Sequence, residues 1–464
     1  MRGVAVSVSR EARGDGGLPP LGARPGVTVV IPVPDPDGTY GKEELEHVME
    51  RARERIGPGK DLDVLLCTTL PPPDREPPGQ RVLTVPGPDC LWELARTGLA
   101  AAEGEVVLLA RPGTVPRRAE IDGHVRAHLA EHAAVAVGRA TVEAGTDGPR
   151  PDRLREVYSK SLTSYPRELL GAVGVADTRA PEELLHRMLQ FGAVLVPGPR
   201  TELVAPAGKD TGATARNRTD GPADAPLADR DPDLEHRVPW HPARRARPAR
   251  LWEVPYTDVV VDAFHANVEE VRITADSLLN SSDADLVLTL VGPWGARDRA
   301  TAGTVRLLRE LYRYEPRVGL ADHTPEPGPE VPFRLWLPAG IELVPDAVRT
   351  LAATADERAA GVLTVLCGER GELRWERTSA LARARLTGAG PEGTAPPWTA
   401  CSVEPHLVVE EAPPWPPDGD ERIRQARRES RALKEDARRW ERRIRALTRG
   451  RAARLVLGRR TGLG

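Results

Sequence analysis

Two stretches of this chain contain runs of apolar, β-branched residues, and they limit most strongly what it can fold into. Residues 27–33 read VTVVIPV, and residues 258–262 read DVVVD. A continuous run of this kind is typical of a strand buried on both faces, as in the parallel sheet of an α/β domain. Because one hydrophobic core seldom serves more than about 250–300 residues, a chain of 464 residues should contain more than one domain.

Helical and strand patterns alternate after each run. After the first run we expect a helix over 42–55, a strand over 63–69, a helix over 91–102 and a strand over 105–110. After the second run we expect the same order: a helix over 268–279, a strand over 285–290, a helix over 305–314 and a strand over 332–338. This alternation predicts mainly parallel sheets with a ligand crevice at the carboxyl ends of the strands. The similar order in the two halves predicts two tandem copies of one nucleotide-binding type of unit.

One motif joins a helix to the last strand of the first unit. Residues 95–102 read ARTGLAAA, Gly-Glu follows at 104–105, and Arg111-Pro112-Gly113 comes directly after the strand. This arrangement resembles the family 2 glycosyltransferases, in which an Ala-Arg-Asn-x-Gly-type helix leads through Gly-Glu and a buried strand into an Asp-X-Asp motif. Arg111 and Gly113 stand where the two aspartates belong.

A second motif supports the same resemblance. Residues 183–193 read ELLHRMLQFGA and are followed by VLVP, similar to the family pattern Glu-Leu-x-x-Arg-Leu-x-x-x-Gly-Ala. The resemblance covers about residues 27–200 by motif and 256–385 by pattern alone. It implies an α/β fold with two tandem nucleotide-sugar-transferase-like (GT-A) domains, mainly parallel sheets and, from the tail sequence, a C-terminal basic helix.

The resemblance also implies three acidic positions, and each holds another residue in this chain. The strand-end Asp that binds the nucleotide base falls on Thr68, and the Glu-Asp pair that supplies the general base falls on Ala180-Pro181. The crevice positions for a nucleotide sugar would be Pro32, Thr68, Arg111 and Gly113. Glu182 and Glu183 are the remaining candidates for a base.

The second unit has Leu290 and residues 338–340 (Pro-Ala-Gly) at the corresponding strand ends. Mg²⁺ and Mn²⁺ prefer oxygen ligands, so we expect no divalent metal cofactor in either unit.

Two functions follow from the resemblance. One is a role in surface-glycan or cell-wall-glycopolymer synthesis, with a nucleotide-sugar donor and an acceptor glycan as partners. Transfer itself would then need Arg111 to offset the diphosphate charge without a metal. The alternative is a non-catalytic scaffold that binds a partner transferase or an acceptor glycan. The sequence leaves open whether the chain is an enzyme.

Histidines and cysteines offer weaker signals. His124, His128 and His132 recur at helical spacing, and we favour a solvated or amphipathic helix face over a zinc site. The four cysteines have no metal-ligand spacing, so we expect buried free thiols.

Composition divides the rest of the chain. The predicted organisation is a disordered N-terminal segment (1–26), a first transferase-like domain (27–204), a linker (205–250), a second, degenerate domain (251–386), a Pro-rich linker (387–420) and a basic amphipathic helix (421–464). The final segment carries 16 Lys or Arg against 5 Asp or Glu, although the whole chain has a net charge of −3.

That basic segment also has an apolar seam. Its members, at alternating three- and four-residue steps, are Ile423, Ala426, Ser430, Leu433, Ala437, Trp440, Ile444 and Leu447. An anionic membrane or a partner protein would contact the neighbouring residues Arg438, Arg439, Trp440, Arg442 and Arg443. The alternative is a helix that is solvated or packs on the body of the protein, and nucleic acid is the less favoured partner. No apolar run is long enough for a membrane span, so we expect a cytoplasmic protein, with a peripheral position at the inner face of the membrane as the alternative.

Overall fold

The structure is a computed structural model. It describes residues 21–22, 25–34, 42–57, 59, 61–73, 76–86, 90–111, 114–139, 162–200, 234–240, 244, 252–295, 299–389 and 398–410. The basic segment 421–464, with Arg438, Arg439, Trp440, Arg442 and Arg443, lies outside the described residues, as do Gly113 and nearly all of the N-terminal segment.

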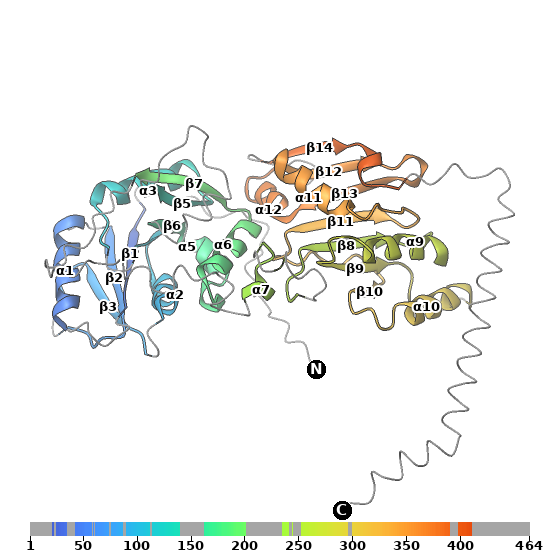
Figure 1. Ribbon diagram of the computed structural model, residues 1–464. Helices are drawn as coiled ribbons and strands as arrows, with labels where there is room; N and C mark the ends of the chain where they lie inside the picture. Colours follow the sequence, from blue (N-terminus) through green and yellow to red (C-terminus); the bar gives the residue numbers. More distant parts are fainter. Residues whose placement is uncertain are drawn as a thin grey trace, which may run out of the picture. The chain divides into compact units, whose positions relative to one another are not determined.

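The first domain is built on a seven-stranded sheet (Figure 1). Its strands are β1 (Val27–Val33), β2 (Leu62–Thr68), β3 (Gln80–Thr84), β4 (Val106–Leu109), β5 (Ala134–Arg139), β6 (Thr163–Pro166) and β7 (Val194–Arg200), in the order β3-β2-β1-β4-β6-β5-β7. All neighbouring strands are parallel except that β6 runs antiparallel to β4 and β5. The sheet is therefore mainly parallel, as the alternating pattern predicts.

Helices cover both faces of this sheet, which explains why β1 is apolar at nearly every position. One face packs against α1 (Lys42–Ile56) and α3 (Arg118–Ala130); the other packs against α2 (Leu91–Ala101), α5 (Arg167–Ala172) and α6 (Pro181–Gln190), with a short 3-10 turn, η2 (Val175–Asp177), before α6. Val29 lies in the core with Leu45 of α1, whereas its neighbour Val30 lies in the core with Leu94 of α2. Successive strand residues point to opposite faces, so both must be apolar here.

The second domain repeats this topology. Its strands are β8 (Thr257–Asp262), β9 (Leu286–Val291), β10 (Val318–Ala321), β11 (Phe333–Pro338), β12 (Ala360–Leu366), β13 (Glu372–Arg377) and β14 (Thr399–Val403), in the order β10-β9-β8-β11-β13-β12-β14. Strand for strand, this is the order of the first sheet, with β13 as the antiparallel counterpart of β6. The prediction of two tandem α/β units with mainly parallel sheets is confirmed.

The helices of the second domain differ from those of the first. They are α9 (Val268–Leu279), α10 (Arg299–Leu311), α11 (Ala347–Glu357) and α12 (Thr378–Leu386), with 3-10 turns η6 (Gly368–Arg370) and η7 (Pro405–Leu407). In the first domain α2 connects β3 to β4, but residues 322–332, which connect β10 to β11, contain no helix. The second sheet therefore lacks a counterpart of α2.

Parts of both predicted linkers belong to the folded domains. Within 205–250, Leu234–Arg237 form the helix α7, and Arg244 is buried. Within 387–420, β14 adds the edge strand of the second sheet by pairing in parallel with β12. The linker boundaries drawn from composition are wrong at these points, because tertiary contacts recruit segments whose own sequence has little periodicity. Among the described residues no helix is long and apolar enough to span a membrane.

Candidate functional site

The first candidate site is the edge where the parallel strands of the first sheet end. Pro32 and Thr68 lie on neighbouring strands near this edge, with Pro32 paired to Cys67 and Val33 paired to Thr68. Strand β4 pairs with the other side of β1, and Arg111 lies two residues beyond its end. The intervening residue, Ala110, donates its backbone N–H to the carbonyl of Val30 at 2.9 Å. Three of the four predicted crevice residues therefore meet at one edge, while Gly113 lies outside the described residues.

Thr68 is fully buried at the end of β2. Its hydroxyl accepts a hydrogen bond from the backbone N–H of Leu70 at 3.2 Å, and its carbonyl accepts one from Val85 at 2.8 Å. A threonine held in this way supplies no charge to a nucleotide base. It fixes the turn that follows the strand.

Arg111 brings a positive charge to this edge. Its carbonyl accepts hydrogen bonds from the backbone N–H of Thr114 at 3.0 Å and from the Thr114 hydroxyl at 2.8 Å. The half-buried guanidinium makes no hydrogen bond or ion pair with any residue in the described ranges. A guanidinium with free N–H groups can bind an anion such as a phosphate through two parallel hydrogen bonds.

The described residues at this edge do not form a set of ligands for a divalent metal ion. Mg²⁺ and Mn²⁺ need oxygen ligands, and Arg111 has none in its side chain. Across the part of the chain that the structure describes, no group of three or more His, Cys, Asp or Glu side chains is placed to hold a metal.

The two candidate bases start α6, and the structure puts Glu183 in a different environment from the one a base needs. Its carboxylate is buried, accepting hydrogen bonds from Arg187 Nη2 at 2.7 Å, Arg237 Nη1 at 3.1 Å and the backbone N–H of Arg179 at 2.8 Å. Both guanidinium groups hold the same carboxylate oxygen, Oε1, and the Arg179 N–H holds the other. Glu182 is half-buried on the same turn. The contacts of Glu183 point to a structural role.

The corresponding edge of the second sheet is partly covered by a tryptophan that the motif analysis missed. Trp294 donates its indole N–H to the carbonyl of Leu290 at 2.7 Å, and a Cβ atom built on Gly292 would lie 2.7 Å from its ring. The ring therefore lies against the end of β9, which extends to Val291. A Gly-Pro-Trp-Gly run after an apolar strand is the sequence signal for this tight return.

An exposed carboxylate, Asp262, ends β8, the strand next to β9. Its Oδ1 accepts a hydrogen bond from the backbone N–H of Phe264 at 3.0 Å, and its carbonyl accepts one from Ala339 at 2.9 Å. Gly340, at the predicted metal-motif position, has a φ of 92° and follows β11 in a turn. These residues shape a turn at each strand end, and no cluster of ligand oxygens forms among the described residues.

Of the two alternatives for the histidine face, the solvated one is wrong, and the face belongs to an amphipathic helix. His124 and His128 on α3 are 0% and 1% exposed because this face packs against the sheet. His124 Nδ1 and His128 Nε2 lie 2.7 and 2.8 Å from the single hydroxyl of Ser164 on β6. One hydroxyl has one proton, so it donates to one ring and accepts from the other. Burial, followed by the charge of the next histidine, lowers the pKa of His124 to about 3 and of His128 to about 4.

The four cysteines are free thiols, but not all are buried. Cys67 lies in the core, and burial raises the pKa of its thiol to about 12. Cys90, before α2, is exposed, and Cys367 and Cys401 are half-buried, so the expectation of a buried thiol is confirmed for Cys67 alone among the four.

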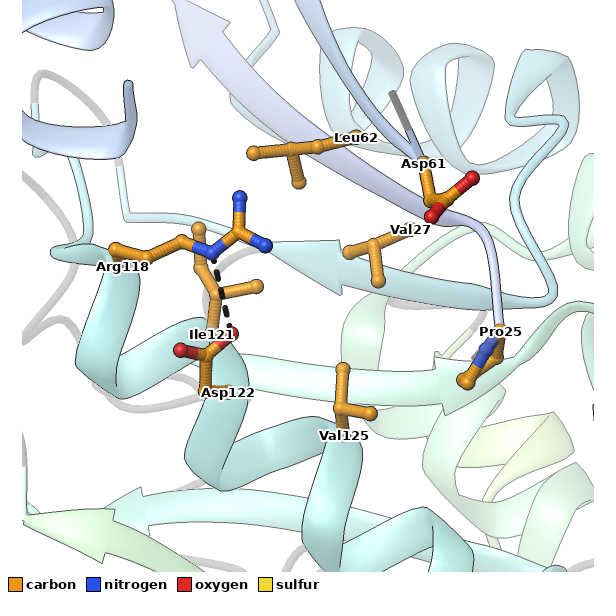
Figure 2. A pocket seen from close by; sticks show the side chains of 8 residues that line it. All are labelled: Pro25, Val27, Asp61, Leu62, Arg118, Ile121, Asp122 and Val125. Atoms are coloured by element: carbon orange, nitrogen blue, oxygen red, sulfur yellow. Dashed lines mark hydrogen bonds and ion pairs between the residues drawn. The ribbon is translucent and has the colours of Figure 1, made fainter. Parts of the chain in front are cut away.

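A cavity of about 200 Å³ lies at the opposite edge of the first sheet (Figure 2). Val27 and Leu62, at the starts of β1 and β2, line it together with Ile121 of α3. Arg118 and Asp122 form an ion pair at 3.2 Å along its side. Since the amino ends of parallel strands face away from the crevice at their carboxyl ends, this cavity is separate from the candidate site.

Comparison with known proteins gives a limited result. No protein-family model and no curated protein matches the chain. Among the solved structures that match the chain in part, S. aureus TarS is 15% identical with a TM-score of 0.21, and the match covers 27% of this chain and 48% of TarS. The mannosyltransferase PcManGT from Pyrobaculum calidifontis, in complex with GDP-Man and Mn²⁺, is 16% identical with a TM-score of 0.29, covering 41% of this chain and 61% of that one. The 2-C-methyl-D-erythritol 4-phosphate cytidylyltransferase from Thermus thermophilus is 20% identical with a TM-score of 0.24, covering 39% of this chain and 93% of that one.

A further TarS structure contains UDP-GlcNAc. The chain spans about half of TarS and three-fifths of the mannosyltransferase. At these TM-scores the likenesses assign neither a family nor an activity to this chain.

Proposed function

We propose that this chain is a glycosyltransferase-like protein of surface-glycan or cell-wall-glycopolymer synthesis that binds the diphosphate group of a nucleotide sugar without transferring the sugar. In this role it is a scaffold that presents or senses its ligand for a partner transferase or an acceptor glycan. The proposal combines the family resemblance in the sequence with the side chains present at the strand-end edge of the first domain.

The observation that carries the proposal is the pairing pattern of the charged groups. Arg111 has no ion-pair partner among the described residues, whereas Glu183 is held by Arg187 and Arg237. A binding site for a diphosphate needs a positively charged side chain that is not already paired with a carboxylate. A transferase also needs a free carboxylate as general base, and Glu183 lacks that freedom. Binding without transfer is the function that this combination favours.

The experiment measures binding and turnover separately. Calorimetry with UDP, UDP-GlcNAc and GDP-Man in the presence of EDTA should detect metal-independent binding. Arg111→Ala should weaken it by about tenfold or more, because charge-assisted hydrogen bonds contribute about 1.5–3 kcal/mol. Arg126→Ala, an exposed arginine on α3, is the matched control and should bind normally. Equal affinity of the Arg111→Ala and parent proteins for every nucleotide would refute the proposal.

A second candidate is metal-independent sugar transfer, favoured by the same Arg111 guanidinium, which has no partner among the described residues. Arg111 would offset the charge on the departing diphosphate, and Glu182 would act as the base. This function predicts donor consumption in EDTA that both Arg111→Ala and Glu182→Gln abolish. Binding without any donor consumption, over a range of acceptor glycans, favours the scaffold.

The basic segment gives the proposed scaffold a means of attachment. Arg438, Arg439, Trp440, Arg442 and Arg443 would contact an anionic membrane surface or a partner protein. The corresponding location is the cytoplasm, at the inner face of the membrane.

A further inference from the structure

The segment between the two domains packs on the residue that precedes α6. Leu234 and Val238, in and next to α7, form a small apolar cluster with Ala180. Val238 is fully buried, Leu234 is 3% exposed and Ala180 is 9% exposed. Since α6 starts at Pro181, α7 covers the point where this helix begins.

An ion pair fixes α7 to the same helix. Arg237 Nη1 lies 3.1 Å from Glu183 Oε1, and Arg237 Nε lies 3.4 Å from Glu253 Oε2. The Arg237 side chain is 14% exposed and that of Glu183 is 1% exposed, so the pair is largely removed from water. Removing one partner of a buried ion pair leaves an uncompensated buried charge and is therefore strongly destabilising.

The other end of the segment is anchored in the second domain. Arg244 lies 3.2 Å from the carboxylate of Asp285 and stacks 4.6 Å above the ring of Trp252. His236 joins the two ends, because its carbonyl accepts a hydrogen bond from Val254 at 3.0 Å and its ring packs edge-on against Trp252. Burial lowers the pKa of Arg244 to about 10, so the guanidinium stays charged at neutral pH.

The second domain closes the neighbouring side of α6. In the connection between β10 and β11, which has no helix, the carbonyl of Glu330 lies 2.7 Å from His186 Nε2 and its carboxylate lies 3.4 Å from Arg187. Burial raises the pKa of Glu330, and the nearby Arg187 partly opposes that effect. The loss of an α2 counterpart thus leaves room for an interdomain contact.

We propose that residues 234–240, anchored through residues 252–254, form a strap that closes the first domain at the start of α6, beside Ala180 and Pro181, and that must detach before any molecule can reach the buried Ala180 side chain. The effect of the strap on ligand access rests on the proposed function. In the alignment with the family 2 glycosyltransferase pattern, Ala180 and Pro181 occupy the place of the general base, where an acceptor hydroxyl would approach. The strap then keeps acceptors out of the first domain while the strand-end edge with Arg111 stays available to a nucleotide.

The closure can be measured in the full chain with Ala180→Cys and a maleimide reagent, reading each site by mass spectrometry. The native thiols provide internal references, since Cys90 is exposed and Cys67 is buried. The new thiol should react at least about tenfold more slowly than Cys90, and Arg237→Ala should raise its rate about tenfold, as expected when a local opening becomes easier. Arg272→Ala, an exposed arginine on α9 that pairs with Glu269, is the matched control and should leave the rate unchanged.

Two outcomes overturn the strap. One is an introduced thiol at position 180 that reacts as fast as Cys90 while Arg237 is intact, and the other is a rate that Arg237→Ala does not change. If Cys67 also becomes reactive, the Arg237→Ala variant has unfolded. Val238→Ala, which changes no charge, is then used in its place and should likewise raise the labelling rate at position 180. The labelling involves no nucleotide, so its failure is distinct from a failure of the proposed nucleotide binding.

Discussion

The guanidinium of Arg383 on α12 donates hydrogen bonds to both carboxylate oxygens of Glu131, which follows α3 in the other domain. The two residues are 252 positions apart. Together with Glu330 and the strap, this pair joins the two sheets within a single compact unit that extends to Val409.

Arg383→Ala should lower the free energy of unfolding by about 1–3 kcal/mol, since it removes a charge-assisted bidentate contact whose guanidinium is largely buried. Arg385→Ala is the control, because this exposed arginine lies two residues further along the same helix. Urea unfolding followed by circular dichroism compares the two. Equal midpoints would show that the Arg383 pair contributes nothing measurable.

Gly192→Ala should destabilise the protein by about 2–4 kcal/mol through strain and crowding. Gly192 has a φ of 101°, and an added Cβ atom would lie 2.6 Å from the backbone nitrogen of Arg383. Gly171→Ala serves as the opposite case, because nothing lies within 4 Å of a Cβ there and its helical backbone accepts alanine. In thermal unfolding, the midpoint of Gly171→Ala should equal or exceed that of the parent protein. An unchanged midpoint for Gly192→Ala would contradict the close approach of the α12 backbone to Gly192.

The buried histidine pair should make the protein less stable in acid. His124 and His128 have lowered pKa values of about 3 and 4, so between these values and the unfolded value near about 6.5 the unfolded chain binds more protons. Stability should therefore fall as pH drops below about 6.5, by at most about 1.4 kcal/mol per pH unit for each ring. Asp285, whose pKa burial raises to about 6, acts in the opposite direction.

Nuclear magnetic resonance of ε1-labelled histidine isolates the two rings from that opposing group. The resonances of His124 and His128 should keep their neutral positions at pH 5, and the same rings should titrate near about 6.5 once urea unfolds the chain. A native-state titration of either ring above about pH 5.5 would mean that water reaches the Ser164 network.

Divalent metal should have no specific effect on nucleotide binding. The side chains at the strand ends of both sheets provide no set of oxygen ligands among the described residues. A thermal melt with UDP-GlcNAc should give the same midpoint with Mn²⁺ as with EDTA, within the shift that Mn²⁺ causes alone. A stabilisation that appears only with metal and nucleotide together, and disappears with chelator, would contradict this expectation.

The basic segment should attach the protein to an anionic surface or partner. Its 16 basic residues should favour adsorption to vesicles containing phosphatidylserine at low salt. Attachment should weaken as salt rises, because the Debye length falls from about 10 Å at 0.1 M to about 3 Å at 1 M. A chain truncated after Asp420 should lose co-sedimentation. Neutral phosphatidylcholine vesicles are the control, and identical co-sedimentation of the two chains would assign the segment no such role.

Local patterns in the sequence were enough to define the central elements of each domain. The apolar run 27–33 became β1 with those bounds, and the amphipathic pattern 268–279 became α9 with those bounds. A strand buried on both faces is apolar at nearly every position, and a helix packed on one face is apolar at every third or fourth position, so both patterns can be seen in a short stretch of sequence. The repeated order of elements was readable for the same reason.

The features between those elements depend on long-range packing. The antiparallel strands β6 and β13 carry polar residues such as Thr163 and Arg374, whose pairing depends on distant neighbours. The placement of Glu183 depended on Arg237, which is 54 positions away in a segment without periodicity. Motif spacing identified Glu183 as a carboxylate near a potential site, but only packing determines which charges meet, because a buried ion pair forms between residues that the fold brings together.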